Sequence, residues 1–261
     1  RALELYEELL TRDHENTQFQ SYVAMTQNNL GTLLSDMGRW EEARKWFECA
    51  LGMREELLER DRENTQFQSY VTTTENNLGI LLSDMGLLEE AKGRYERALE
   101  LVKGQKNPHD TGWTLALLGK LELEREVPAL EAAKNFLESS IEKLNRDIRP
   151  HYPNALNLLA LCYYKLGEQK KREARQEQTR EAAGNYVSAS AWFYKRSCTR
   201  YKEAYELPYA RMPVELLIDA HLADAFASSV LIISEEEDRK AVAMLNEAIE
   251  RIETAFALAK D

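Results

Sequence analysis

Four histidines and three cysteines are the side chains of this 261-residue sequence best suited to binding a metal or acting as a nucleophile. No histidine has a second ligand at a spacing typical of metal sites, and the odd cysteine number fits neither a disulfide framework nor a zinc knuckle. Cys49 and Cys162 have mostly apolar neighbours, so we expect them to be small core residues. We therefore expect no metal, no cofactor and no enzymatic activity. The remaining residues of this set are His14, His109, His151, His221 and Cys198.

A basic stretch from 165 to 202 is the second set with possible chemistry. It holds 10 basic and 4 acidic residues, net +6, with aromatic residues among them. Basic and aromatic side chains in combination are typical of surfaces that bind single-stranded nucleic acid or an acidic partner. The aromatic residues also fall at helical spacings, so a solvated helix over a packed aromatic face is the alternative that we favour. The candidate basic patch is Lys195, Arg196, Arg200 and Lys202.

The composition indicates a helical protein. Hydrophobic residues make up 44% and charged residues 30%, with only 11 Gly and 6 Pro, which is too apolar for disorder and too poor in turn formers for an all-β fold. The net charge of −11 has the wrong sign for binding nucleic acid over most of the surface. The longest apolar stretch, 214–233, is interrupted by charged residues, so we expect no membrane span and a cytoplasmic location. The chain opens at Arg1 within a helical pattern, and we expect a fragment of a longer protein.

A tandem duplication is the strongest signal in the sequence. Residues 2–49 align with 50–97 without a gap, with 32 identities in 48 positions. Each repeat contains two successive sets of apolar residues at helical spacing, separated by Gly38 in the first copy and Gly86 in the second. We predict that each repeat is a pair of helices, with Asn16 or Thr17 as the N-cap and these glycines in the left-handed conformation after the first helix.

The pattern inside each pair resembles the tetratricopeptide repeat. Gly31 and Ala43 are small where the two helices are expected to cross, and Phe47 with Ala50 fills the seam to the next pair. The alternative is a generic helical bundle. We do not favour it, because the same spacing of small and large residues occurs in both repeats. The resemblance implies an all-α, right-handed superhelical α-solenoid of tandem helical hairpins. The residues that carry it are Leu30, Gly31, Leu34, Gly38, Ala43, Phe47, Ala50 and Leu51, and then Leu78, Gly79, Leu82, Gly86, Ala91, Tyr95, Ala98 and Leu99.

The resemblance extends over nearly the whole chain, in about five hairpins. The expected divisions are a partial repeat at 1–13, repeats at 14–61, 62–106, 107–147 and 150–207, and a fifth repeat or capping hairpin at 211–261. The fourth repeat carries a polar insertion at 168–181, which we predict to be an exposed helical extension.

The 48-residue period is longer than the usual 34 residues, and we expect it to lengthen both helices. Long repeats with a Thr-x-Asn-Asn-Leu element, at residues 26–30 and 74–78, are most similar to those of kinesin light chain and of prokaryotic sensor arrays. In such arrays the first helix of each hairpin lines a concave groove, and the resemblance implies that groove asparagines hold a peptide backbone. The groove residues expected here are Asn28, Asn76, Asn157, Thr32, Ser35, Ser83, Asp36 and Asp84.

The alternative for the asparagines is that they bond to neighbouring helices inside the stack. This alternative is stronger for Asn29 and Asn77, which precede the expected core residues Leu30 and Leu78, than for Asn28 and Asn76.

The sequence thus predicts a non-catalytic protein–protein interaction module that binds a peptide segment in its groove. The lysines and arginine with which some tetratricopeptide domains grip acidic tails are missing, and residues 1–104 have a net charge of −8, so we expect a neutral or basic partner. Two alternatives remain: a sensor or regulatory array within a larger effector protein, and a nucleic-acid-binding solenoid that uses residues 165–202.

Overall fold

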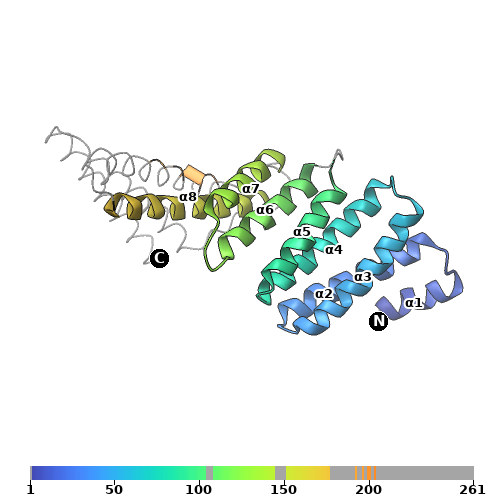
Figure 1. Ribbon diagram of the computed structural model, residues 1–261. Helices are drawn as coiled ribbons and strands as arrows, with labels where there is room; N and C mark the ends of the chain where they lie inside the picture. The colour runs from blue at the N-terminus through green and yellow to red at the C-terminus, as the bar shows by residue number, and fades with distance from the viewer. Residues whose placement is uncertain are drawn as a thin grey trace. The chain divides into compact units, whose positions relative to one another are not determined.

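The computed structural model describes residues 2–103, 108–144 and 151–176, and five single residues, Trp192, Arg196, Thr199, Arg200 and Glu203. All regular secondary structure in these ranges is α-helical (Figure 1). The prediction of an all-α fold built from tandem helical hairpins is confirmed. The helices are α1 (Ala2–Arg12), α2 (Thr17–Asp36), α3 (Trp40–Arg60), α4 (Thr65–Asp84), α5 (Leu88–Leu101), α6 (Pro108–Glu124), α7 (Leu130–Lys143) and α8 (His151–Gln176).

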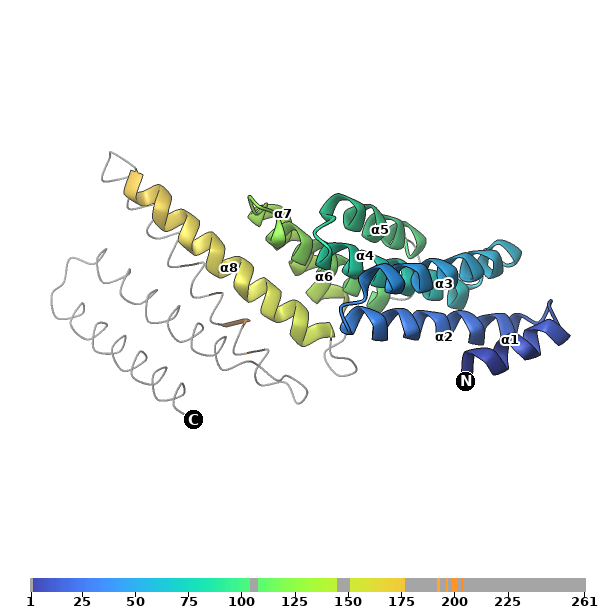
Figure 2. The same cartoon turned by 90° about the horizontal axis from the view of Figure 1, so that it is seen from below.

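The chain divides into two compact units, Arg1–Leu121 and Glu122–Asp261. In the first unit, α2 packs on α3 and α4 on α5 as two hairpins, α3 packs on α4 between them, and α1 packs on α2 (Figures 1 and 2). In the second unit, α7 packs on α8.

The first helix of each duplicated hairpin begins at an asparagine cap. The Asn16 side chain accepts hydrogen bonds from the backbone N–H of Gln18 and Phe19, both at 3.1 Å, and Asn64 does the same one repeat later. These bonds satisfy N–H groups that have no partner within the helix. The prediction of a cap at Asn16 is confirmed.

Glycine ends both helices. Gly38 and Gly86 have φ of +73° and +79°, and the N–H of Arg39 bonds to the carbonyl of Leu34 at 2.9 Å. A residue with a Cβ is strained in this left-handed conformation, whereas glycine adopts it readily. The predicted role of the two glycines is confirmed.

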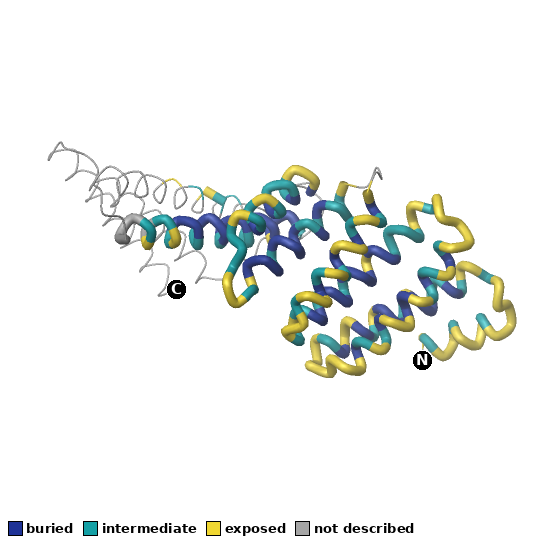
Figure 3. Tube along the Cα trace, in the orientation of Figure 1, coloured by how far each residue is buried: buried dark blue, intermediate teal, exposed yellow. Residues whose placement is uncertain are grey.

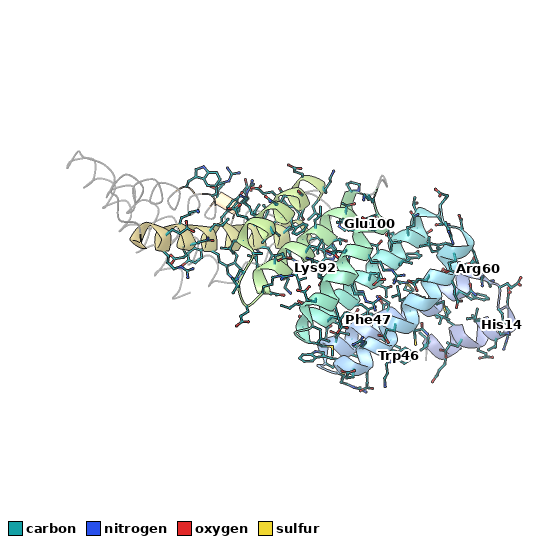
Figure 4. The ribbon with its side chains drawn as sticks, viewed as in Figure 1. His14, Trp46, Phe47, Arg60, Lys92 and Glu100 are labelled. Carbon is teal, nitrogen blue, oxygen red and sulfur yellow. The ribbon has the colours of Figure 1, made fainter. Side chains whose placement is uncertain are left out.

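Close approach of the two helices in each hairpin explains the glycines inside α2 and α4. A Cβ placed on Gly31 would lie 2.7 Å from two ring atoms of Phe47, whose side chain projects from α3 (labelled in Figure 4). Gly79 and the Tyr95 ring repeat this arrangement in the second hairpin. The hydrophobic core of the first unit surrounds Phe47 and includes Leu34, Ala43, Leu51, Val71, Leu78 and Leu81 (dark blue in Figure 3).

The core of the second unit joins the end of α6, α7 and α8 around Tyr163. Cys162 lies in this core, fully buried, and its Sγ donates to the carbonyl of Leu130 at 3.3 Å. Helix α8 continues without a break from the repeat pattern into the first nine residues of the polar insertion. Residues 177–181, and the segments predicted as the second helix of the fourth repeat and as the fifth repeat, lie almost wholly outside the described residues.

Two expectations are wrong. The longer repeat does not lengthen both helices in each copy, because α3 has 21 residues but α5 only 14. Cys49 is exposed, since its position on α3 faces away from the packed seam, whereas Cys162 is buried as expected. Among the described residues, no helix has the length and apolarity needed to cross a membrane.

Candidate functional site

One stripe of exposed residues runs along the first helix of each duplicated hairpin. The spacing of four, three and four residues keeps the stripe on one line of an α-helix. Helix α2 and helix α4 lie side by side, so the two lines are neighbours. We call these residues the first-helix stripe: Met25, Asn29, Thr32 and Asp36 on α2, all exposed, and Thr73, Asn77, Ile80 and Asp84 on α4, exposed or half-buried.

Asn28 and Asn76 do not belong to this stripe. Asn28 is only 6% exposed, and its Oδ1 accepts a hydrogen bond from Asn77 Nδ2 at 3.1 Å. Asn76 is 3% exposed and pairs with the Thr114 hydroxyl of α6, which accepts from Asn76 Nδ2 at 2.9 Å. The structure therefore places Asn28 and Asn76 between neighbouring first helices, the arrangement given above as the alternative to a groove position.

The physical reason is a rotation of one residue. A step of one residue turns the side chain by about 100° around the helix axis, so Asn28 and Asn29 point in different directions. Asn29 is exposed, and Asn77 is half-buried. The sequence held a signal that would have identified Asn29: counting four residues from Met25 and then seven to Asp36 defines a single exposed line that contains Asn29 and leaves Asn28 out.

The other predicted groove residues have mixed positions. Thr32 is exposed, and its hydroxyl donates to the Asn28 carbonyl at 3.2 Å. Ser35 and Ser83 are half-buried. Asn157 is half-buried on α8 of the second unit, and no described residue makes a hydrogen bond to its buried Oδ1.

Asp36 and Asp84 give one end of the stripe a negative charge. Each is the last residue of its helix and is exposed. A carboxylate at this end is unfavourable, because the last turn of a helix carries the negative end of the helix dipole. Neither aspartate makes an ion pair with another described residue. The two charges therefore leave a negative potential open to a ligand.

Buried charges lie behind the stripe, between α3, α4 and α5, and the sequence did not indicate them. The Glu75 carboxylate is fully buried and contacts the guanidinium groups of Arg94 and Arg97 at 3.2 and 3.1 Å. Burial raises the pKa of Glu75 above its ordinary value, and the two arginines offset part of this effect.

Arg54 on α3 is a second buried charged residue. Its Nη1 donates to the Tyr70 carbonyl at 2.7 Å and to the Thr74 hydroxyl at 2.5 Å. Burial lowers the pKa of Arg54 to about 10. Buried Arg54 and Glu75 are bonded to the scaffold, so these charges hold adjacent helices together and are not offered to a ligand.

Of the predicted basic patch, the structure describes Arg196 and Arg200. The Arg196 guanidinium lies 4.7 Å from the Trp192 ring centroid and 5.4 Å from that of Tyr163, and its Nε donates to the Tyr163 hydroxyl at 3.2 Å. Arg200 pairs with Glu203 at 2.6 Å. Both guanidinium groups thus have partners within the second unit. Lys195 and Lys202 lie outside the described residues.

No group of three or more histidine, cysteine, aspartate or glutamate side chains that could hold a metal ion occurs within the described ranges.

Comparisons with known proteins agree with the hairpin geometry. Two family profiles, each described as tetratricopeptide repeat, match residues 23–62 and 70–146. A curated relative, the photosystem I assembly protein Ycf3 of Rippkaea orientalis, is 27% identical over 110 residues, which is 36% of this chain. The match spans 58% of the length of that relative.

Among solved structures, BtubC (BKLC) from P. vanneervenii is similar with a TM-score of 0.60 at 16% sequence identity. The match covers 98% of this chain and 89% of BtubC, and at this identity it shows a shared fold. The repeated hairpins and the two profile matches together show that residues 23–62 and 70–146 of this chain are tetratricopeptide repeats.

Proposed function

We propose that the protein binds an extended segment of a partner protein along the first-helix stripe, with Asn29 and Asn77 as the residues that contact the partner's backbone. Tetratricopeptide repeats indicate a role in protein–protein interaction, and the name of the Ycf3 relative, an assembly protein, agrees with such a role. The observation that carries the proposal is the return of one exposed or half-buried carboxamide at the same place on two adjacent first helices.

The chemistry of asparagine suits a ligand of varied sequence. A carboxamide offers both a donor and an acceptor, so it can bond to a peptide group irrespective of the side chains that the peptide carries. Packed helices stand about 8 to 10 Å apart, close to the roughly 10 Å that three residues of extended chain span. Asn29 and Asn77 are therefore spaced to meet every third peptide group of an extended ligand, with Asn77 contributing mainly its Oδ1, because its Nδ2 donates to Asn28.

The charge of the stripe favours a neutral or basic partner. Asp36 and Asp84 repeat the same exposed carboxylate beside the asparagines, and their excess negative charge attracts lysine or arginine and repels acidic segments. Thr32, Ser35 and Ser83 supply further hydroxyl groups near this end of the stripe.

Selection from a displayed random peptide library on the full chain tests the proposal. We expect the selected peptides to be enriched in lysine and arginine, and we expect Asn29→Ala to weaken them by about 0.5 to 1.5 kcal/mol, the net contribution of one hydrogen bond. Asn29 is exposed, so this variant should fold normally. Selected peptides that are not basic, or that bind Asn29→Ala as tightly as wild type, would contradict the proposal.

A matched charge variant separates groove binding from other sites. Asp36→Asn with Asp84→Asn removes the two carboxylates at nearly constant shape, so it should weaken the same peptides and reduce the salt dependence of their binding. Glu7→Gln with Glu8→Gln makes the same change of net charge on exposed residues of α1 and should leave binding nearly unchanged.

Tetratricopeptide repeats are generally non-catalytic, and we assign no reaction to this chain. The regulatory-array and nucleic-acid alternatives stay predictions. No described feature favours the nucleic-acid alternative, because the two described arginines of the basic patch have partners in the second unit.

A further inference from the structure

The first-helix stripe stays open on α4, although this helix has another first helix on each side. Asn77 donates to Asn28 of α2, and Asn76 bonds to Thr114 of α6, so these two asparagines mark the directions of the two neighbours. They are one residue apart, or about 100° around the helix axis. Within this angle, about 20° to 60° from Asn77, lie the other stripe residues of α4, which are Thr73, Ile80 and Asp84. The stripe is therefore a surface that neighbouring repeats leave uncovered.

An exposed carboxylate stands at the end of this surface in both repeats. Asp84 is the last residue of α4, and Asp36 is the last residue of α2. Each lies seven residues after the stripe asparagine of its own helix, Asn77 or Asn29, which is about 10.5 Å along the helix axis. A lysine or arginine side chain is long enough to extend from a backbone held at the asparagine toward the aspartate. Each repeat thus offers one backbone contact and one charge contact in the same register.

The spacing between repeats favours one conformation of the ligand. Packed helices stand about 8 to 10 Å apart. Polyproline II has three residues per turn and a rise of about 3.1 Å per residue, so every third residue returns to the same side after about 9 Å. In a β-strand, residues three apart point to opposite faces. An α-helix bonds its own peptide groups and offers none to the asparagines. Of these three conformations, polyproline II alone presents equivalent groups to both repeats.

We propose that the segment bound by the first-helix stripe is a polyproline II helix with a lysine or arginine at every third residue, one cation for each aspartate. This inference rests on the proposed function, since it takes the stripe as the binding surface. The backbone N–H of each basic residue donates to a stripe asparagine, for which Asn77 has its Oδ1, because its Nδ2 donates to Asn28. The two residues between the cations make neither contact. Proline is therefore accepted there, and it lowers the entropy that the ligand loses on binding.

Three labelled peptides of equal length and composition test the pattern by fluorescence anisotropy against the full chain. Each carries two arginines in a background of proline and alanine, at a spacing of two, three or four residues. Proline follows each arginine, which disfavours the helical conformation in all three peptides. We expect the spacing of three to bind at least fivefold more tightly than the other two. Asp36→Asn and Asp84→Asn should each weaken this peptide by about three- to tenfold, because each variant removes the partner of one arginine.

Glu56→Gln is the matched control, because it removes one exposed carboxylate from α3, outside the stripe. Its affinity for the peptide with a spacing of three should stay within twofold of wild type. Equal losses in Glu56→Gln and Asp84→Asn would overturn the inference, because overall charge would then explain the binding.

The peptide series also separates this inference from the proposed function. Equal affinity of the three peptides, or tightest binding at a spacing of two or four, overturns the polyproline II pattern. The proposed function still stands in that case if Asn29→Ala weakens the binding. Failure of the peptide with a spacing of three to bind where library-selected peptides do bind overturns the inference in the same way. Absence of binding by any peptide, including a selected one, would contradict both.

Discussion

Asparagines that are adjacent in this sequence differ in burial. Asn28 and Asn76 are buried in hydrogen bonds between neighbouring first helices, while Asn29 is exposed. A hydrogen bond inside a protein contributes little net free energy, but a buried partner left unpaired costs about 1 to 3 kcal/mol.

The asparagine pair gives a first prediction. Asn76→Ala should lower the free energy of unfolding by about 0.5 to 1.5 kcal/mol, because it removes the buried bond to Thr114, whose hydroxyl still donates to the Asp110 carbonyl. Asn29→Ala should change it by less than about 0.5 kcal/mol, as expected for an exposed site. Urea unfolding monitored by circular dichroism measures both. Equal effects of the two variants would contradict the placement of the asparagines.

Glu75 makes stability depend on pH in a defined direction. Burial raises its folded-state pKa above the unfolded value of about 4.5, so the unfolded state loses its proton first as pH rises. The free energy of unfolding of the wild type should therefore fall relative to that of Glu75→Gln as pH rises from 4 to 7. Unfolding of both proteins at several pH values measures the difference. A difference that stays constant, or that grows in favour of the wild type, would show that the two arginines outweigh burial.

The two described cysteines should differ in reactivity. Cys49 is exposed, while burial raises the pKa of Cys162 to about 12 and removes its thiolate at neutral pH. In a Cys198→Ser background, a disulfide reagent should label one thiol quickly in the folded protein and the second only after denaturation. Retention of the fast phase in Cys49→Ser would contradict this assignment.

At the scale of the helices, the sequence allowed the start of α2, the ends of α2 and α4 and the crossing within each duplicated hairpin to be predicted, but not the different lengths of α3 and α5. Asn16 caps a helix, Gly38 adopts the left-handed conformation and Gly31 allows close approach of two helices. Each role depends on local geometry, so the residue type alone predicts it. The side of α2 on which Asn28 lies was harder to predict. Asn28 is next to Asn29 in the sequence, and the exposed side and the side toward α4 both carry polar side chains. The buried Glu75 was hidden because its equivalent in the first repeat is the neutral Gln27, so the repeat pattern gave no charge at that position.

The glycines inside the helices provide a test of crossing geometry. Gly31→Ala should lower the free energy of unfolding by about 1 to 2 kcal/mol, because strain against the enclosed Phe47 ring exceeds the gain in helix propensity. Gly52→Ala on α3 meets no atom within 4 Å and should raise it by about 0.5 to 1 kcal/mol. Chemical denaturation of the pair measures both. Stabilisation by Gly31→Ala would mean that the helices do not cross closely.

At the scale of the whole molecule, each compact unit has a core of its own. Leu78→Ala creates a cavity in the core of the first unit and should cost about 2 to 5 kcal/mol. Hydrogen exchange should then accelerate mainly in α2 to α5, with a smaller change in α7 and α8, because energy in a repeat array is distributed among neighbours. A uniform loss of protection along the described helices would indicate one cooperative unit.

The bond between Asn77 and Asn28 has a consequence for how the array can grow. Asn77 is the equivalent of Asn29, so the bond joins unlike positions of two successive repeats, 49 residues apart. A junction made of unlike halves runs head to tail, has no two-fold axis and can recur without limit. Suppose that a gene encoded residues 14–61 twice in succession. The added hairpin would find an acceptor equivalent to Asn28 on one side and a donor equivalent to Asn77 on the other. Lengthening by duplication therefore requires no new interface, and the two repeats at the start of this chain, with 32 identities in 48 positions, have the form that such an event leaves behind.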